Sequence, residues 1–485
     1  MKKLYKVLTA VLAAVMCFAI LGCSKKGGSE ITYSERFPDD FDKSFLVTSQ
    51  KEFAYDETDG GKRALLLYEK LHKIYYRTEA DFPWRLGYYE SKGNNSFVWD
   101  YGALFTMMNA VCRANPDDAG AKAQLKDIAD TLERYYLPFD NTRVADRSLW
   151  EKGIEGNMLS DEFIDLAVRM MKITGNQDDD GKVRYRMPVR IYSSGVGGGD
   201  PYYDDNVWLV MALLEAGKIL GEAKYIERAE DCLMYVLSGW DISAGGGLRW
   251  KESFSTKNTC SNGPAAMACF DFYHYYDGLT PQNDEERALY ADKKSFYLQF
   301  GKYIYDWTKS VLMDQVDGTY EDRITLLDND TYRVERGKLT YTSGTMLSSA
   351  VRLYEITQDE TYKADAEKTL RGSYQTFVSR DRFYAPGIDL YPVSDGWFHV
   401  YLVRGYLDFA RVFGNDAYLK KMADTMDFAY KNARNYYGLI QNDWSGRDQS
   451  ADAHYNVLEL RNAAAPIEVI ALLDAWFDAH PNQTA

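Results

Sequence analysis

Histidine and cysteine are both scarce in this chain. It contains five histidines and six cysteines in 485 residues, and the four cysteines beyond residue 23 have no metal-type spacing: Cys112, Cys232, Cys260 and Cys269. Four scattered cysteines do not form a disulfide framework, and all but Cys260 lie in apolar helical stretches typical of buried thiols. We therefore expect no structural metal and no cofactor, and any chemistry must come from carboxylates.

Strand signals and positive charge are also in short supply. Alternating runs of β-branched residues bounded by turn pairs are almost absent, which argues against a β-rich or doubly wound α/β fold. The formal net charge is −15, and it becomes −18 if the three lysines of the first segment are removed with a leader. So acidic a protein is a poor partner for nucleic acid or anionic headgroups, and it suits a neutral substrate.

The first 22 residues have the pattern of a signal peptide. Three lysines precede an apolar run over 7–21, and this run ends at Leu21-Gly22-Cys23. The ending resembles a bacterial lipobox, which implies cleavage before Cys23 and lipidation of its sulfur. We expect an exported protein anchored to the outer membrane by lipid alone, on its cell-surface or periplasmic face. A plain secretory signal cut elsewhere is the alternative.

Three segments follow from this pattern: a lipoprotein signal peptide over 1–22, the lipidated cysteine and a linker over 23–55, and a single domain over 56–485. The domain shows helix after helix at a period of 3.6 residues. The predicted helices are 61–78, 99–113, 121–136, 160–174, 205–220, 223–238, 262–276, 286–311, 341–356, 359–377, 396–412, 417–434 and 463–479.

The predicted helices are of two kinds. Those near residues 223, 359 and 417 are rich in Lys, Glu and Asp, as expected for an outer, half-solvated layer. Those beginning near Trp99, Asp205, Asn262, Tyr341, Gly396 and Ala463 are apolar over most of their surface. Six inner helices paired with six outer ones predict an all-α fold, an (α/α)6 barrel.

The starts of the inner helices are the candidate site, because a barrel brings them to one rim. Most of these starts pair a hydrogen-bonding side chain with a ring or a glycine, as in Trp99-Asp100-Tyr101-Gly102. Capping is the alternative explanation for each start taken alone, since Asp, Asn, Ser and Thr accept hydrogen bonds from free backbone N–H groups. One cap needs one acceptor, whereas Asp204-Asp205 supplies two.

The segment Tyr203-Asp204-Asp205-Asn206-Val207-Trp208 is the most informative in the chain. Two neighbouring carboxylates can divide the nucleophile and proton-donor duties at a glycosidic bond, and flat aromatic rings pack against sugars. Consecutive Cα atoms are about 3.8 Å apart, which is compatible with a carboxyl separation of about 5–5.5 Å, the retaining geometry. We expect Asp205 to titrate above Asp204, because two close carboxylates resist ionising together.

With these motifs the chain resembles glycoside hydrolase family 76, the endo-α-1,6-mannanases of (α/α)6-barrel fold. The resemblance rests on Tyr202 to Trp208 and is supported by the motifs at Trp99, Trp250, Lys257-Asn258 and Tyr341. It implies hydrolysis of α-1,6-linked mannan backbones with retention, Asp204 being the nucleophile and Asp205 the acid/base. We expect endo action and a monomer that binds α-mannan polysaccharide or oligosaccharide.

The remaining site candidates would bind sugar hydroxyls or line subsites. They are Trp99, Asp100, Tyr101, Tyr203, Asn206, Trp250, Lys257, Asn258, Asn262, Tyr341, Asp395 and Trp397. The glycine-rich stretch over 195–199 suits a tight chain approach or a groove. A phosphate cradle is the other interpretation of these glycines, but no Lys-Ser/Thr pair follows them. The stretch over 138–189 is longer than the family core needs, so it is either an insertion over the rim or a solvated decoration.

Two other classes of function share many of these features. A surface lipoprotein that binds glycans without cleaving them would also be helical, lipidated and aromatic, but it would not need adjacent carboxylates. Other α/α-barrel enzymes, such as sugar epimerases and unsaturated glucuronyl hydrolases, depend on histidine pairs or basic residues. Neither is evident at these helix starts.

Overall fold

The computed structural model describes residues 60–78, 81–86, 94–138, 142–145, 158–177, 183–327, 331–380, 387–435, 437–448 and 459–481. The chain divides between residues 41 and 42, and all described residues belong to the second unit, 42–485. The predicted signal peptide, Cys23 and the linker over 23–55 lie outside the described residues. Their boundaries stay predictions.

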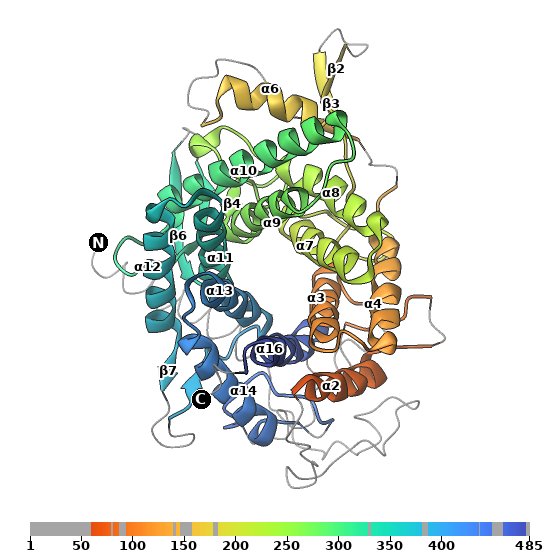
Figure 1. Ribbon diagram of the computed structural model, residues 1–485, viewed down its shortest axis with the longest axis vertical. Coiled ribbons are helices and arrows are strands. Elements are labelled where there is room, and N and C mark those ends of the chain that lie inside the picture. The colour runs from red at the N-terminus through yellow and green to blue at the C-terminus, as the bar shows by residue number, and fades with distance from the viewer. Residues whose placement is uncertain are drawn as a thin grey trace, which may run out of the picture. The chain divides into compact units, whose positions relative to one another are not determined.

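Six helices of the second unit form a closed inner ring (Figure 1). Each packs on the next and the last packs on the first: α3 (Val98–Ala114), α7 (Tyr203–Leu220), α9 (Thr259–Asp277), α11 (Thr340–Thr357), α13 (Trp397–Phe413) and α16 (Leu460–Ala479). They are buried over most of their length, because their apolar residues face both the ring interior and the outer layer.

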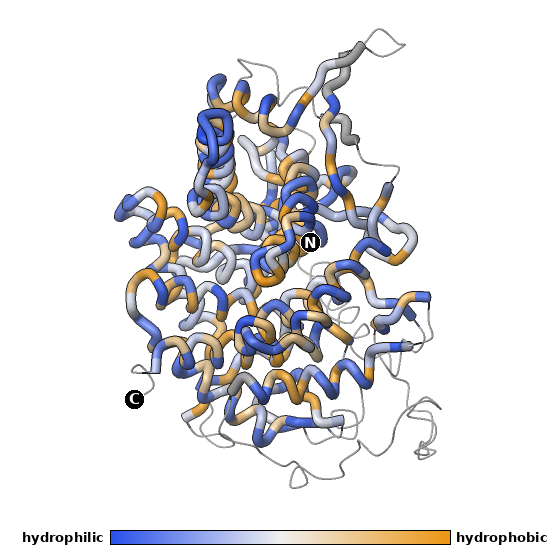
Figure 2. Tube along the Cα trace, turned by 45° about the vertical axis from the view of Figure 1, so that its right-hand side comes forward, coloured by the Kyte–Doolittle hydropathy of each residue, from blue (hydrophilic) through white to orange (hydrophobic). Residues whose placement is uncertain are grey.

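Six further helices surround this ring, each packed on one or two inner helices (Figure 1). They are α2 (Gly60–Tyr75), α4 (Ala119–Thr131), α8 (Ala223–Leu237), α10 (Asp284–Leu312), α12 (Glu360–Phe377) and α14 (Ala417–Asn432). Figure 2 shows hydrophilic and hydrophobic residues alternating along the helices, as expected where one face is buried and the other solvated. The predicted (α/α)6 barrel of six inner and six outer helices is confirmed.

Close approach of backbones shapes the inner ring where α11 meets α13. A Cβ added to Gly344 would lie 2.5 Å from the backbone nitrogen of Leu402. No side chain fits such a gap, so glycine lets these two helices pack in direct contact. The glycine that the sequence places beside Tyr341 thus serves the ring rather than the site.

Every helix predicted from periodicity is present within a few residues, but the prediction at 160–174 is too long. Helix α6 spans Asp161–Met170, and residues Thr174–Gln177 form strand β2. The side chain of Phe163 packs on Phe296, Phe300 and Tyr303 of α10. Figure 1 shows α6 on the outer side of α10, away from the ring. The described part of 138–189 therefore extends the outer layer and does not cover the rim.

The described residues include eight short strands, which no sequence pattern located individually, and these form three small antiparallel sheets. One contains β1 (Thr142–Ala145), β3 (Val183–Pro188) and β2; another contains β7 (Ser379–Arg380) and β8 (Asp389–Leu390). The third joins β4 (Thr256–Asn258), β5 (Glu321–Leu326) and β6 (Tyr332–Lys338). Because β4 leads directly into α9, this third sheet holds the start of an inner helix.

Helix starts differ between the two layers. Side chains cap three outer helices, where Asp118, Asn283 and Asp359 accept from backbone N–H groups of α4, α10 and α12. At the inner helix starts, the residue in the cap position accepts no such bond in any of the six helices. Asp395, one residue before the cap position of α13, accepts from the backbone N–H of Trp397 at 3.2 Å. Capping therefore accounts for Asp395 but not for the adjacent acids Asp204 and Asp205.

Cysteines 112, 232, 260 and 269 are buried free thiols, which confirms the interpretation of Cys112, Cys232 and Cys269. Within the described residues, helices that combine the length and the hydropathy needed to cross a bilayer are not found.

Candidate active site

The two aspartates lie in the first turn of α7. Tyr202 precedes the helix in an extended conformation. The side chain of Asn206 accepts a hydrogen bond from the backbone N–H of Tyr192 and donates to the carbonyls of Tyr192 and Tyr202. These bonds tie the approaching chain to the first turn, so that both carboxylates are presented at the rim.

Three donors converge on the carboxylate of Asp204. The indole Nε1 of Trp250 donates to Oδ2 at 2.8 Å, and the thiol of Cys260 donates to the same oxygen at 3.2 Å. The backbone N–H of Asp205 donates to Oδ1 at 3.0 Å. Burial raises the pKa of Asp204, and these hydrogen bonds act in the opposite direction because they stabilise the charged form.

The carboxyl group of Asp205 has a different environment. Among the residues that the structure describes, no hydrogen-bond donor or basic side chain is paired with it. Burial raises the pKa of Asp205 well above its ordinary value, and the nearby charges of Asp204 and Asp100 raise it further. The two neighbours thus differ in their surroundings: hydrogen bonds oppose the rise in the pKa of Asp204, whereas nearby negative charges add to the rise in the pKa of Asp205.

Both aspartates line a cavity of about 430 Å³ at the starts of the inner helices. Aromatic rings from five segments form much of its wall: Phe97, Trp99, Tyr202, Trp208, Trp250, Tyr341, Trp397 and Phe398. The expected convergence of helix starts is confirmed, since residues from α3, α7, α9, α11 and α13 meet here. Such rings offer flat apolar faces for stacking on a ligand.

Several polar atoms in this region have no intramolecular partner among the described residues. They are Nε1 of Trp99, Nε1 of Trp397 and Oδ1 of Asn258, all buried. Buried polar groups are normally hydrogen-bonded, so these three atoms are exceptions, and they belong to residues of the cavity wall.

The structure separates the predicted substrate-binding residues into two groups. Trp99, Trp250, Asn258, Tyr341 and Trp397 line the cavity beside the two aspartates. The others are absent from its wall. For the first group substrate contact stays a prediction, and each member has a surface that a ligand could reach.

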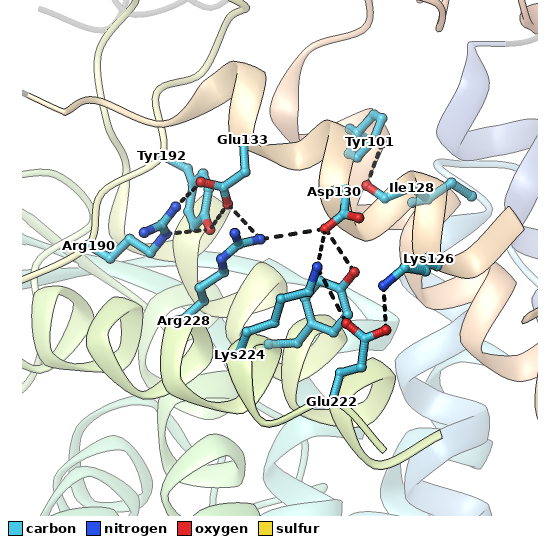
Figure 3. Close-up of polar contacts among 11 residues, drawn as sticks. Tyr101, Lys126, Ile128, Asp130, Glu133, Arg190, Tyr192, Glu222, Lys224 and Arg228 are labelled. Atoms are coloured by element: carbon cyan, nitrogen blue, oxygen red, sulfur yellow. Dashed lines mark hydrogen bonds and ion pairs between the residues drawn. The ribbon is translucent and has the colours of Figure 1, made fainter. Parts of the chain in front are cut away.

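Four predicted residues have structural roles instead. The hydroxyl of Tyr101 donates to the carbonyl of Ile128 in α4 at 2.7 Å (Figure 3), and Tyr101 is not on the cavity wall. Asn206 holds the entry to α7, as described above, and Asn262 makes the equivalent bonds to Leu248 and Asn258. Tyr203 is buried against the ring of Tyr235 at a centroid distance of 4.8 Å. We therefore assign these residues to the scaffold rather than to substrate contact.

Lys257 is also turned away from the cavity. Its fully buried ammonium group donates to the carbonyls of Asp241, Ser243 and Gly246 and forms an ion pair of 2.7 Å with the Asp241 carboxylate. Burial lowers the pKa of Lys257 to about 8, although the Asp241 charge opposes this. The side chain therefore holds the loop 241–247 together and does not contact the cavity.

Asp100 and Asp395 meet on one arginine beneath the cavity wall. Arg461 from the start of α16 pairs with Asp100 at 2.8 Å and also with Asp395, and its guanidinium lies 4.5 Å from the ring centre of Trp99. Burial raises the pKa of Asp100 to about 6, although Arg461 acts against this. These acids support Trp99 from below and are not on the cavity wall.

Other wall residues were missed by the sequence analysis. Asp322 and Arg323 reach the cavity from strand β5, and Cys260 contacts Asp204 directly. Only residues 324–326 and 332–335 alternate apolar and polar side chains, on either side of Asp328-Asn329-Asp330, which is a short strand signal. Ser194 and Leu339 complete the wall from loops before α7 and α11.

The glycine-rich stretch directs Ser194 to the wall. Gly199 has a φ of +129°, and a Cβ at this position would lie 2.5 Å from the Ser194 hydroxyl. Only glycine fits this turn without strain. The stretch therefore provides the tight chain approach that its composition indicates.

Fold and site together define an α/α-barrel protein with a carboxylate pair in an aromatic cavity, an arrangement of the carbohydrate-active class. Within the described residues, no group of three or more His, Cys, Asp or Glu side chains could hold a metal ion. The model of glycosyl hydrolase family 76 matches residues 122–468, and the chain belongs to this family.

Similar proteins agree with this assignment. A putative mannan endo-1,6-alpha-mannosidase of Schizosaccharomyces pombe is 22% identical over 58% of this chain, and the match spans 63% of that relative, less than two thirds of its length. A family 76 glycoside hydrolase from a bovine Bacteroides thetaiotaomicron strain superposes with a TM-score of 0.67 at 22% identity, covering 87% of this chain and 79% of that one. An inactive α-1,6-mannanase variant from a Salegentibacter species, in complex with α-1,6-mannotriose, gives 0.58 at 20% identity, with 86% and 98% covered.

Proposed function

We propose that this protein is a retaining glycoside hydrolase that cleaves α-1,6-mannosidic linkages inside mannan backbones. The observation that carries the proposal is the asymmetry of two adjacent carboxyl groups in one cavity. Asp204 accepts from an indole, a thiol and a backbone N–H, whereas Asp205 is raised in pKa and has no such donors among the described residues. One group is suited to attack and the other to donate a proton.

The reaction would proceed in two steps. Asp204 attacks the anomeric carbon while Asp205 gives its proton to the departing glycosidic oxygen, forming a glycosyl ester. Asp205, now ionised, then takes a proton from a water molecule that attacks the same carbon and releases Asp204. When the ester breaks, Asp204 becomes a charged carboxylate again. Its negative charge raises the pKa of Asp205, which favours a protonated Asp205 for the next cycle.

The substrate class is supported by the family and by the chemistry of the cavity. The Salegentibacter protein is an α-1,6-mannanase made inactive by replacing two consecutive aspartates with asparagine, a pair that parallels Asp204-Asp205. The aromatic wall suits neutral sugar rings, as does the net charge of −15. Endo action has the support of the Schizosaccharomyces relative's description. Phe97, 53% exposed at the rim, would extend the stacking surface beyond the cavity.

Product analysis tests this proposal. We expect the purified protein to release oligosaccharides of mixed length from linear α-1,6-mannan, with the first product carrying an α-anomeric reducing end by proton NMR. Release of mannose alone would reject endo action, and a β-anomer would reject retention. If the protein binds mannan but wild type and Asp204→Ala both leave it intact, the glycan-binding alternative holds.

We also propose that Cys23 carries lipid and anchors the enzyme to the outer membrane, because the ending of residues 1–22 resembles a lipobox. Cells fed an alkyne-tagged fatty acid should label the wild-type protein and not Cys23→Ser. Equal labelling of both would reject the anchor.

A further inference from the structure

We infer that Cys260 is a positioning residue for Asp204. Its thiol and the Trp250 indole together hold Oδ2 of Asp204, so that Oδ1 is the oxygen that attacks the anomeric carbon. The inference rests on the function proposed above and adds to it the attacking atom and the group that orients it.

The hydrogen bonds on Asp204 are unequal between its two oxygens. Both side-chain donors, Trp250 Nε1 at 2.8 Å and Cys260 Sγ at 3.2 Å, lie on Oδ2, whereas Oδ1 faces the backbone N–H of Asp205. A carboxylate oxygen has two lone pairs in its plane. Attack by Oδ2 would break one of these hydrogen bonds, and attack by Oδ1 leaves both intact.

The two donors are themselves held in place. Cys260 lies in the first turn of α9, directly after strand β4, whose residues Thr256 to Asn258 pair with β5. Trp250 donates its backbone N–H to the carbonyl of Thr256 at 3.0 Å and accepts from the backbone of Tyr203 at 3.1 Å. One network therefore joins both donors to the start of α7, next to the carboxylate that they contact.

The thiol must stay protonated to donate, and its surroundings ensure this. Cys260 is 6% exposed, and burial together with the charge of Asp204 raises the pKa of the thiol well above its ordinary value. An S–H group is a weaker donor than a hydroxyl. Cys260 can thus orient Asp204 while reducing its nucleophilicity less than serine would.

Oδ2 of Asp204 keeps the same two hydrogen bonds through both steps of the reaction. In the first step Oδ1 bonds to the anomeric carbon, the glycosidic C–O bond breaks, and its electron pair takes the proton of Asp205. Oδ2 becomes the ester carbonyl and still accepts from both donors. In the second step a water molecule gives a proton to Asp205 and attacks the anomeric carbon. The bond from that carbon to Oδ1 breaks, and Asp204 becomes a carboxylate again. Because hydrogen bonds to an ionised acceptor are the stronger ones, the donors favour this departure.

Kinetics of Cys260 variants test the inference. Cys260→Ala removes a donor to the carboxylate, so the pKa of Asp204 rises and the acid limb of the kcat/KM profile moves to higher pH. We expect kcat to fall about two- to tenfold, in line with the loss of one modest hydrogen bond. Cys260→Ser should return the acid limb toward that of wild type. Cys269→Ala, a buried cysteine on the same helix, is the control and should leave the profile unchanged.

An unchanged acid limb in Cys260→Ala would overturn the inference while the mannanase stands. Accumulation of the glycosyl ester supports it further, since slower departure of Asp204 leaves more intermediate than in wild type. A folded Cys260→Ala variant with wild-type intermediate levels and wild-type pH dependence would show that the thiol only fills space.

A spectroscopic measurement separates this inference from the proposed function. The infrared S–H stretch lies in a region free of other protein bands and falls in frequency when the thiol donates. Cys260→Ala should remove one low-frequency component, and Asp204→Asn should move that component upward because the acceptor loses its charge. If this component does not move in Asp204→Asn, the thiol of Cys260 does not donate to Asp204, whatever the activity of the protein. A sensitive component in a protein that cleaves no mannan would keep the contact and reject the mannanase.

Discussion

The two ends of helix α7 hold buried acids in opposite environments. At the helix starts, no basic side chain among the described residues pairs with Asp204 or Asp205. At the helix ends, a smaller cavity of about 140 Å³ is lined by acids and arginines together. There Glu215 pairs with Arg113 at 2.7 Å, and Glu468 pairs with Arg404 at 2.6 Å.

Helix α7 alone contains both situations, with Asp204 and Asp205 in its first turn and Glu215 near its end. Arg113 lies in the last turn of α3, where the helix dipole favours a cation. The first turn of α7 offers backbone N–H groups and no cations. The C-terminal part of α7 is therefore stabilised by ion pairs. Its first turn keeps carboxyl groups without a cationic partner among the described residues, which are costly to bury but able to react.

The strongest test of this contrast is Asp204→Asn. It removes the attacking group, so kcat/KM should fall on the order of 10⁴-fold or more, as for other catalytic residues. Asp322→Asn, another carboxyl group on the same wall, is the matched control and should change KM more than kcat. Equal losses in both variants, measured on linear α-1,6-mannan, would mean that the pair has no special role.

At the helix ends, Arg404→Met should destabilise the fold. It leaves Glu468 and Glu215 buried without their shared cation, which costs about 3–5 kcal/mol of unfolding free energy for a buried pair. Arg411→Met removes an exposed arginine from the same helix, paired with Glu355, and should cost at most about 1 kcal/mol. Urea unfolding measures both. Similar losses of unfolding free energy in the two variants would contradict a structural role for the cavity at the helix ends.

The variant Asp205→Asn should be more stable than wild type at neutral pH. An acid with a raised folded-state pKa destabilises the fold where it is ionised, and this effect disappears as the pH falls through that pKa toward the unfolded value of about 3.9. We expect a gain of roughly 0.5–2 kcal/mol, typical of relieving a functional site. Thermal unfolding should show this gain shrinking toward acid pH. A gain that stays constant across that range would show that charge is not its source.

The smallest effect is expected where a rim residue faces outward. Tyr101→Phe loses the hydrogen bond to Ile128 and should cost about 1 kcal/mol of stability with kcat/KM unchanged. Tyr341→Phe alters a residue of the cavity wall and should raise KM. If Tyr101→Phe raised KM as well, our assignment of Tyr101 to the scaffold would be wrong.

An ion-pair network behind the site shows why such residues are hard to assign from sequence. Arg190, Glu133 and Arg228 join the outer layer to the segment before α7 (Figure 3). The hydroxyl of Tyr192 contacts Glu133, and the backbone of Tyr192 holds Asn206. This series of contacts links the outer surface to the first turn of α7 through three segments that are distant in sequence, so no local sequence pattern reveals it.

Local patterns were sufficient for the helices. A period of 3.6 residues located every helix of both layers, and the apolar character of six of them distinguished inner from outer. The strands were harder, because β4 has three residues and depends on β5, more than 60 positions later, for its hydrogen bonds. Asp322 and Arg323 reach the same cavity as Asp204 because β4 joins β5 to the start of α9, a pairing that no local pattern reveals.

The sequence by itself determined the barrel and the adjacent acids, since helical periodicity and neighbouring residues are properties of short segments. It also contained the family resemblance that the matched family model confirms. Only the tertiary structure decided that Asp204 accepts the Trp250 and Cys260 donors, that Asp205 has none among the described residues, and that Tyr101, Asn206, Lys257 and Asn262 belong to the scaffold. The reason is physical: a side chain's direction and its hydrogen-bond partners depend on segments brought together by folding, and these partners decide whether a polar residue at a helix start reacts or supports.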